Sequence, residues 1–362
     1  MSAARVVQSI SPALVQPMFN FEHPSLRQTL WGKTFENPVG LAAGFDKNGV
    51  LVKFWSKVGF GFSEIGSVSA RASSGNAKPR AFRLPADKAL VNRMGLNNEG
   101  AEEISRRVKK LSLDQLPPLG INLAKTHDPS IMGKGAILDF RHSFRLMASM
   151  ASYIVLNISC PNTTEGKTFE DPDSLEALLK AIFADRDDLG LDVPIFIKLS
   201  PTFSQYVVFD SAIEEIVSIA LEYGVQGLVA TNTAPDRENL KTPESVIQRI
   251  GNGGLSGSPL THRTTRLIKY LYEKTEGAIP IIAVGGIDSA ETAYANLRAG
   301  ASLVQLYTGM VYRGPGVVKR IKKGLVRLLR QDGFESIEKV IGIDSKLPPN
   351  PITEEVLESM AA

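Results

Sequence analysis

The sequence predicts a (β/α)8 barrel with a short N-terminal appendage and extra strands in the connection between the second and third barrel strands. Short β-rich runs recur along the 362 residues, most end in polar residues or glycine, and amphipathic helical patterns separate most of them. About eight such units close more naturally into a barrel of parallel strands than into an open sheet. The runs are residues 39–43, 62–68, 119–124, 153–159, 195–199, 227–231, 281–284 and 303–307.

Helices are expected between the runs because apolar residues recur there at helical spacing. One helix begins with Asp171 as N-cap and Pro172 as the first helical residue. Another follows a capping pair formed by Asp288 and Glu291. The apolar faces of the expected helices are Val50, Leu51, Phe54, Trp55 and Val58; Leu175, Leu178, Leu179, Ile182 and Phe183; Ile213, Ile216, Val217, Ala220 and Leu221; Leu267, Ile268 and Leu271; Ala293 and Leu297; and Val317, Ile321, Leu325 and Leu328.

Two stretches are longer than simple connections. Residues 69–118 are expected to carry small extra strands and a helix, and residues 161–172 to form an active-site loop or lid. The expected organisation is an N-terminal appendage over residues 1–34, a barrel over residues 35–335 and a C-terminal tail over residues 336–362.

Composition excludes several classes of protein. Lys and Arg total 41, Asp and Glu total 38, and the two signs are interspersed, which argues against disorder and against a nucleic-acid partner. The single cysteine, Cys160, excludes an intramolecular disulfide and iron–sulfur ligation within the chain. The four histidines have no metal-binding spacing, so no metal is expected. No apolar run approaches the roughly 18 residues that suggest a membrane-spanning helix.

Polar groups gather at the predicted C-terminal ends of the strands, where barrel enzymes carry their active sites. Amide and ammonium groups end several runs, although a purely structural barrel needs none there and asparagine is a poor strand former. These residues include Lys47, Ser67, Asn122, Asn157, Lys198, Asn232 and Thr233.

Glycines around the last two runs suggest a phosphate site. Residues 253–257 precede the seventh run, residues 285–286 end it, and residues 307–309 end the eighth. Barrels often bind phosphate through the loops after strands seven and eight, where backbone N–H groups face the anion. The alternative is that each glycine only serves a turn.

Lys198 ends an apolar strand, so its side chain is expected at the barrel mouth. One interpretation is an ammonium group that stabilises the negative charge of a reduced flavin. The alternative is a lysine at the edge of the core that is paired with a carboxylate, because an unpaired buried cation is costly.

Cys160 follows the fourth run and is flanked by Asn157 and Asn162. Its thiolate could accept a proton from a substrate if its pKa is lowered or the working pH is high. The alternative is a small buried apolar residue. The surrounding amides, together with Lys47, suit a planar imide ring that bears a carboxylate.

The motifs as a set resemble those of the dihydroorotate dehydrogenases, and in particular their quinone-linked class 2 branch. The resemblance covers roughly residues 35–315, most of the chain. It rests on NPVGLAAGFDKNG at residues 37–49, NRMGLNN at 92–98, NISCPNT at 157–163, ATNT at 230–233, GGLSG at 253–257 and VGGI at 284–287.

The resemblance implies an FMN enzyme of pyrimidine synthesis that oxidises dihydroorotate to orotate. It implies that Cys160 is the catalytic base, assisted by Lys198 and Asn157. The implied FMN contacts are Ala43, Gly44, Phe45, Asp46, Lys47, Ser67, Asn122, Asn157, Lys198, Thr231, Gly257, Gly286, Tyr307 and Thr308. The implied substrate contacts are Lys47, Asn92, Arg93, Met94, Gly95, Leu96, Asn157, Asn162, Asn232 and Thr233.

Two features depart from the class 2 pattern. The base in that branch is normally serine, whereas cysteine is typical of the soluble class 1 enzymes, so Cys160 is interpreted as a change of base within a class 2 scaffold. Class 2 enzymes also carry an N-terminal helix pair that forms a quinone tunnel at the membrane. Here about 33 residues precede the first strand motif, and Pro12 and Pro17 interrupt their apolar face, so a reduced or reorganised tunnel is expected.

The expected electron acceptor is therefore a quinone, with peripheral attachment to the cytoplasmic side of the membrane or a cytoplasmic location as the alternative. A second possibility is the same FMN half-reaction with fumarate, or with NAD through a partner subunit. A third is a flavin- or phosphate-binding barrel without catalytic activity.

Overall fold

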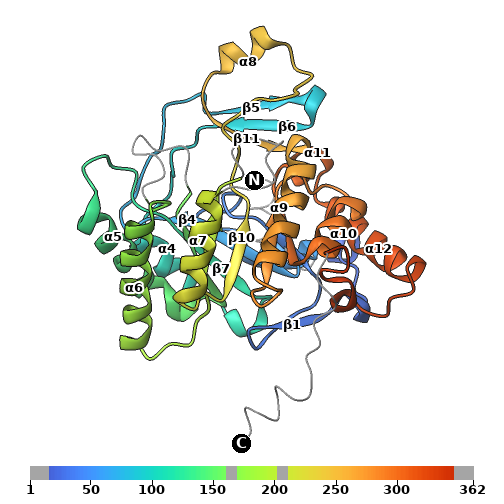
Figure 1. The fold of residues 1–362 in the computed structure, drawn as a ribbon, viewed down its shortest axis with the longest axis horizontal. Coiled ribbons are helices and arrows are strands. Elements are labelled where there is room, and N and C mark those ends of the chain that lie inside the picture. The colour runs from blue at the N-terminus through green and yellow to red at the C-terminus, as the bar shows by residue number, and fades with distance from the viewer. Residues whose placement is uncertain (1–15, 160–168, 202–210, 346–362) are drawn as a thin grey trace, which may run out of the picture.

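The computed structural model describes residues 16–159, 169–201 and 211–345. Within them, eight parallel strands close into a barrel in the order β10-β12-β13-β3-β4-β7-β8-β9, which confirms the predicted fold class (Figure 1). Each predicted run overlaps one barrel strand, and only the eighth strand, β13, begins before its run. The strands are β3 (Val39–Leu41), β4 (Phe62–Val68), β7 (Leu119–Leu123), β8 (Tyr153–Asn157), β9 (Ile195–Leu199), β10 (Gly227–Ala230), β12 (Ile281–Val284) and β13 (Ala301–Leu306).

Helices surround the barrel, and the predicted apolar faces belong to its core, except for Leu221, which is 40% exposed at the end of its helix. Asp171 caps α6 as predicted, since its Oδ2 accepts from the Ser174 N–H at 3.0 Å. The expected capping pair of α10 is wrong by one position, because Ser289 is the N-cap and Thr292 completes the box. The helices are α3 (Val52–Val58), α4 (Ala101–Val108), α5 (Gly133–Met147), α6 (Pro172–Asp188), α7 (Ser211–Glu222), α8 (Glu244–Ile250), α9 (Thr261–Lys274), α10 (Ala290–Ala299), α11 (Thr308–Arg313) and α12 (Gly316–Gln331).

Helix α5 was not predicted from the sequence. Phe140 and Phe144 lie on its buried face, but Asp139 and Ser143 are buried there as well. Asp139 is satisfied by the N–H and the hydroxyl of Thr126. These polar residues interrupt the apolar pattern by which an amphipathic helix is recognised.

The lower barrel interior is filled by aromatic rings that alternate with glycines on neighbouring strands. Tyr153 and Phe196 stack with their ring centroids 4.8 Å apart. A Cβ atom at Gly120 would lie 2.2 Å from the Tyr153 ring, so only glycine leaves room for this ring. The glycines in these strands therefore belong to the packing of the core.

A short hairpin closes the bottom of the barrel. Strands β1 (Gln28–Leu30) and β2 (Lys33–Phe35) pair antiparallel, and the Trp31 ring between them lies 4.6 Å from the Phe196 ring. No periodic pattern marks these three-residue strands, which fall mostly within the predicted appendage. Helix α2 (Gln16–Phe19) precedes the hairpin and packs near α12, where the buried Lys322 ammonium donates to the Asn20 side chain at 2.9 Å.

A three-stranded antiparallel sheet lies above the opposite end of the barrel (Figure 1). Strands β5 (Ala81–Leu84) and β6 (Ala89–Asn92), together with α4, confirm the extra strands and helix expected in residues 69–118. The third strand, β11 (Gly254–Gly257), comes from the glycine segment that was predicted to bind phosphate. This sheet covers the C-terminal ends of the barrel strands.

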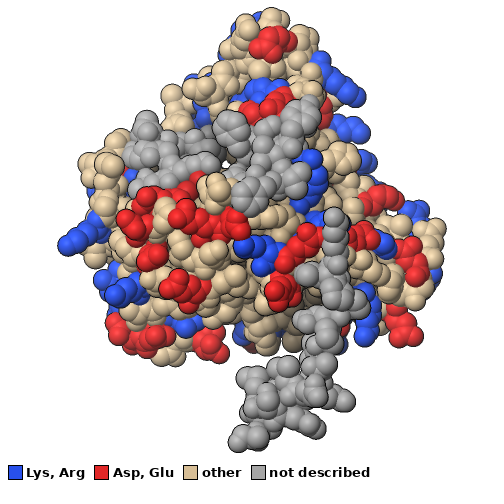
Figure 2. Space-filling model, in the orientation of Figure 1, with Lys and Arg blue, Asp and Glu red and all other residues tan. Residues whose placement is uncertain are grey.

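Positive and negative side chains lie side by side over the visible face of the molecule, in keeping with the small net charge (Figure 2). Among the helices of the described ranges, none combines the length and apolar character of a membrane-spanning segment.

Candidate active site

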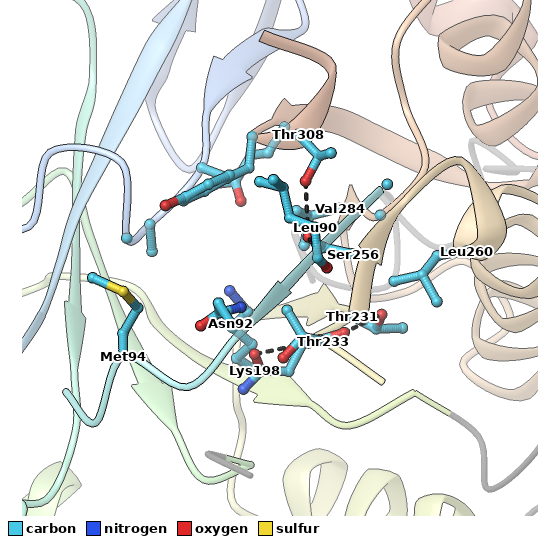
Figure 3. Close-up of a pocket in the computed structure, with 18 of the residues that line it drawn as sticks. Leu90, Asn92, Met94, Lys198, Thr231, Thr233, Ser256, Leu260, Val284 and Thr308 are labelled. Atoms are coloured by element: carbon cyan, nitrogen blue, oxygen red, sulfur yellow. Dashed lines mark hydrogen bonds between the residues drawn. The ribbon is translucent and has the colours of Figure 1, made fainter. Parts of the chain in front are cut away.

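A cavity lies between the C-terminal ends of the barrel strands and the three-stranded sheet. Barrel residues such as Asn157 and Lys198 form its floor, and Asn92 of β6 and Ser256 of β11 line its opposite wall. Figure 3 shows Asn92, Lys198 and Thr233 together on one side, while Ser256 and Thr308 share a 2.8 Å hydrogen bond on the other. The cavity thus has an amide- and ammonium-rich part and a part rich in glycine and hydroxyl groups.

Most of the predicted site residues line this cavity, although they come from all parts of the barrel sequence. They are Ala43, Gly44, Lys47, Ser67, Asn92, Met94, Gly95, Leu96, Asn157, Lys198, Thr231, Asn232, Thr233, Gly257, Gly286, Tyr307 and Thr308.

Asp46 does not line the cavity. Its carboxylate accepts from the backbone N–H groups of Val50 and Leu51, at 2.9 and 2.7 Å, and so satisfies donors at the start of α3. Burial raises the pKa of the Asp46 carboxyl, and these hydrogen bonds act in the opposite direction. Phe45 also lies outside the lining, with its ring edge-on to Trp55 and Tyr307. The structure therefore gives Asp46 and Phe45 contacts next to the cavity, and their predicted contact with the cofactor stays a prediction.

Arg93 and Asn122 also lie outside the lining. The Arg93 guanidinium donates to the carbonyl groups of Ile250 and Asn252, at 2.6 and 3.0 Å, and so ties the end of β6 to the C-terminal end of α8. Asn122 is fully buried beneath the cavity, where its Oδ1 accepts from the Ser67 hydroxyl.

Cys160 and Asn162 lie outside the described residues, as does most of the expected loop over residues 161–172. The residue before Cys160 is held at the cavity. The Ser159 carbonyl accepts from the Asn232 side-chain amide at 2.9 Å. The predicted roles of Cys160 and Asn162 stay predictions.

Amide side chains are tied together across the floor of the cavity. The Asn157 amide donates to the Ser67 hydroxyl at 3.0 Å, and the Asn157 carbonyl oxygen accepts from Asn232 at 3.3 Å. Lys198 pairs in register with Asn157 on the neighbouring strand and is only 7% exposed. The floor therefore offers fixed donors and acceptors next to a buried ammonium group.

The glycine-rich side is formed where two helices begin. Gly286 has a φ of +71°, and a Cβ atom there would lie 2.4 Å from the backbone nitrogen of Thr261, the first residue of α9. Thr308 begins α11 and lines the cavity. Helix starts carry partial positive charge, so this side suits an anionic group. Gly286 thus serves a tight backbone approach and also lines the cavity.

Three polar residues in or next to the cavity were not assigned to it from the sequence: Gln305, Ser256 and the buried Glu64. Gln305 lines the cavity, and its Nε2 donates to the buried Glu64 carboxylate at 2.7 Å. In the described part of the chain, Gln305 Oε1 and Thr233 Oγ1 are buried without a hydrogen-bond partner. The signal was present, since Glu64 and Gln305 lie in predicted buried strands, where a polar residue needs a partner.

Comparison with known proteins identifies the family. The family model for dihydroorotate dehydrogenase matches residues 25–329. A dihydroorotate dehydrogenase (quinone) of Nostoc punctiforme is 44% identical over 329 residues, 89% of this chain and 84% of the relative. One of Haloarcula marismortui is 42% identical over 315 residues, 87% and 84% of the two chains.

Solved structures show the same relationship. The crystal structure of ligand-free dihydroorotate dehydrogenase from Eimeria tenella superposes with a TM-score of 0.85 at 34% identity, covering 96% of this chain and 99% of that one. The chain belongs to the dihydroorotate dehydrogenase family, within its quinone-linked class 2 branch.

Proposed function

We propose that this chain binds FMN in the cavity, oxidises dihydroorotate to orotate for pyrimidine synthesis, and passes the electrons to a quinone. The observation that carries the proposal is the two-part cavity. Its amide and ammonium floor suits a pair of polar planar rings, and its glycine and hydroxyl side suits a phosphate.

The residues present fit FMN. The orphaned Gln305 Oε1 is an acceptor that requires a donor from outside the described chain, and the isoalloxazine ring carries an imide N–H. Lys198 supplies positive charge to the ring system. Gly257, Gly286 and Thr308 would hold the phosphate.

The substrate would lie on the side of Asn92 and Thr233. The amides of Asn92, Asn157 and Asn232 match the alternating C=O and N–H edges of a dihydropyrimidine ring. Lys47 at the same cavity would pair with the substrate carboxylate. These side chains orient the ring and replace the hydrogen bonds to water that the ring loses on binding.

When bound, FMN supplies an acceptor for the hydride from C6 of dihydroorotate. We assign to Cys160 the removal of the C5 proton, which leaves the C5=C6 double bond of orotate. The assignment rests on the sequence motif and on the fixed position of Ser159 beside Asn232. Lys198 stabilises the negative charge that develops beside it.

A quinone acceptor is supported by the names of the relatives. Because quinones partition into lipid, the proposal includes peripheral contact with the cytoplasmic side of the membrane.

The test of the acceptor begins with holoenzyme reduced anaerobically by dihydroorotate. The reduced protein is then mixed with a ubiquinone analogue, fumarate or NAD. Rapid reoxidation by the quinone alone is expected. Reoxidation only by fumarate or NAD would overturn the proposed acceptor.

A further inference from the structure

Glu64 is a carboxylate inside the barrel that the proposed chemistry does not use. It lies on β4 and has no exposed surface. Its two oxygens accept from Asn122 Nδ2 at 2.9 Å, from Gln305 Nε2 at 2.7 Å and from the Tyr153 hydroxyl at 3.4 Å. Burying a carboxylate costs free energy, so this arrangement calls for an explanation.

A carboxylate can only accept hydrogen bonds, and this fixes the orientation of every group around it. Gln305 must turn its NH2 towards Glu64, which turns Oε1 away from it, and this oxygen is the orphaned acceptor of a residue that lines the cavity. Burial, and next the negative charge of Glu64, hold the pKa of Tyr153 well above its usual value, so the phenol remains a donor.

The same constraint extends to the cavity floor through Asn122. Because the Asn122 NH2 faces Glu64, its Oδ1 faces the Ser67 hydroxyl and accepts from it. The Ser67 oxygen then accepts from the Asn157 NH2, which leaves the Asn157 carbonyl oxygen to accept from Asn232. Every donor in this chain points back towards Glu64.

We propose that Glu64 is a positioning residue that sets the amide orientation of Gln305 and Asn157. Through Gln305 it presents a carbonyl oxygen to the cavity, as an acceptor for an N–H group of the bound cofactor. Through Asn122 and Ser67 it orders the amides of the floor. The identity of the cofactor as FMN rests on the function proposed above, whereas the orientation of the amides does not.

The decisive variant is Glu64→Gln, which keeps the size of the side chain but adds an NH2 group where its neighbours already donate. At least one neighbouring amide must turn over or lose its partner. We expect FMN to bind the apoprotein at least about tenfold more weakly, measured by flavin fluorescence. Glu64→Asp is the conservative control, because it keeps an acceptor-only group, and its FMN affinity should be closer to that of the wild type.

A double-mutant cycle separates positioning from general damage to the fold. Gln305→Met removes the orphaned oxygen and should weaken FMN binding to a similar extent. The double variant Glu64→Gln/Gln305→Met should lose less FMN affinity than the two single losses add up to, because part of the effect of Glu64→Gln acts through the oxygen that Gln305→Met removes. Fully additive losses, or an unchanged FMN affinity in Glu64→Gln, would overturn the proposal. If Glu64→Gln does not fold, unchanged affinity in Gln305→Met overturns it instead.

Failure of the proposed function can be distinguished from failure of this inference, because the wild-type apoprotein itself would then not bind FMN. In that case crystal structures of the wild type and of Glu64→Gln still decide the inference. Gln305 and Asn122 amides that both keep their orientation and their partners in the variant contradict it, and an amide that turns over or loses its partner supports it.

Discussion

Asn157 and Lys198 lie opposite one another in the register of β8 and β9, at the C-terminal ends of two neighbouring barrel strands. One contributes an amide that is fixed on both sides by hydrogen bonds, and the other contributes a nearly buried ammonium group. The pairing places the neutral Asn157 amide, which would form hydrogen bonds with the ligand, next to the positive charge of Lys198. This is the local arrangement on which the proposed chemistry depends.

Lys198→Ala should weaken FMN binding about tenfold to a hundredfold and slow flavin reduction by dihydroorotate, because a charged hydrogen-bond donor is lost from a buried site. Fluorescence titration of the apoprotein and anaerobic stopped-flow absorbance measure the two effects. Lys53→Ala removes an exposed lysine on α3 and is the matched control, with no change expected. Unchanged FMN affinity and reduction rate in Lys198→Ala would refute the role of this lysine.

Cys160→Ala should lower turnover by roughly two to four orders of magnitude, the range for loss of a general base, while FMN stays bound. Steady-state kinetics at saturating dihydroorotate, with the flavin content measured in parallel, test this. Cys160→Ser should remain active with its pH profile displaced upward, since a hydroxyl is less acidic than a thiol. Turnover of Cys160→Ala within tenfold of the wild type would exclude this residue as the base.

Gly120→Ala should destabilise the fold by about 1–3 kcal/mol, because the added methyl group would overlap the Tyr153 ring inside the barrel. Gly135→Ala in α5 is the control, since the added methyl group would meet no atom within 4 Å beyond its chain neighbours and the backbone of its own helix. It should be neutral or stabilise by about 0.4–1 kcal/mol. Urea unfolding of the two variants compares them directly. Equal midpoints would show that the barrel interior has room at Gly120.

Asp185 should make the stability depend on pH. Burial tends to raise the pKa of its carboxyl, but hydrogen bonds from Arg141 and Arg145 outweigh burial and hold this pKa below its usual value. A depressed folded-state pKa gives a stabilisation that is fully present above the unfolded value of about 3.9 and is lost as the pH falls through the folded pKa.

Asp185→Asn should therefore be less stable than the wild type by about 1–3 kcal/mol at pH 7, and the difference should shrink below about pH 4. Urea unfolding at several pH values measures this difference. Asp187→Asn, at an exposed position of the same helix, should change little at any pH. A gap between wild type and Asp185→Asn that stays constant into the acid range would contradict the assignment.

The barrel could be predicted because its strands are buried on both faces, so they appear in the sequence as apolar runs that end in polar residues or glycine. The position of most site residues followed from the same pattern, since the ends of parallel strands meet at one end of a barrel. Lys198 and Asn157 were found in this way.

Other features depend on contacts that the sequence does not display. Asp46 and Lys47 are neighbours, yet only Lys47 lines the cavity, because the Asp46 carboxylate serves the start of α3. Glu64 and Gln305 are 241 residues apart, and only the closure of the barrel brings them together. The hairpin around Trp31 has strands too short to show a periodic pattern. It is held by contacts with the aromatic rings at the bottom of the barrel, such as that of Phe196.

The most direct test of the account is anaerobic addition of dihydroorotate to the purified protein, followed by its visible absorbance. We expect bound FMN, about one per chain, and loss of the oxidised flavin absorbance together with formation of orotate. Protein that is colourless and cannot be reconstituted with FMN, or whose flavin absorbance does not respond to dihydroorotate, would contradict the central claim.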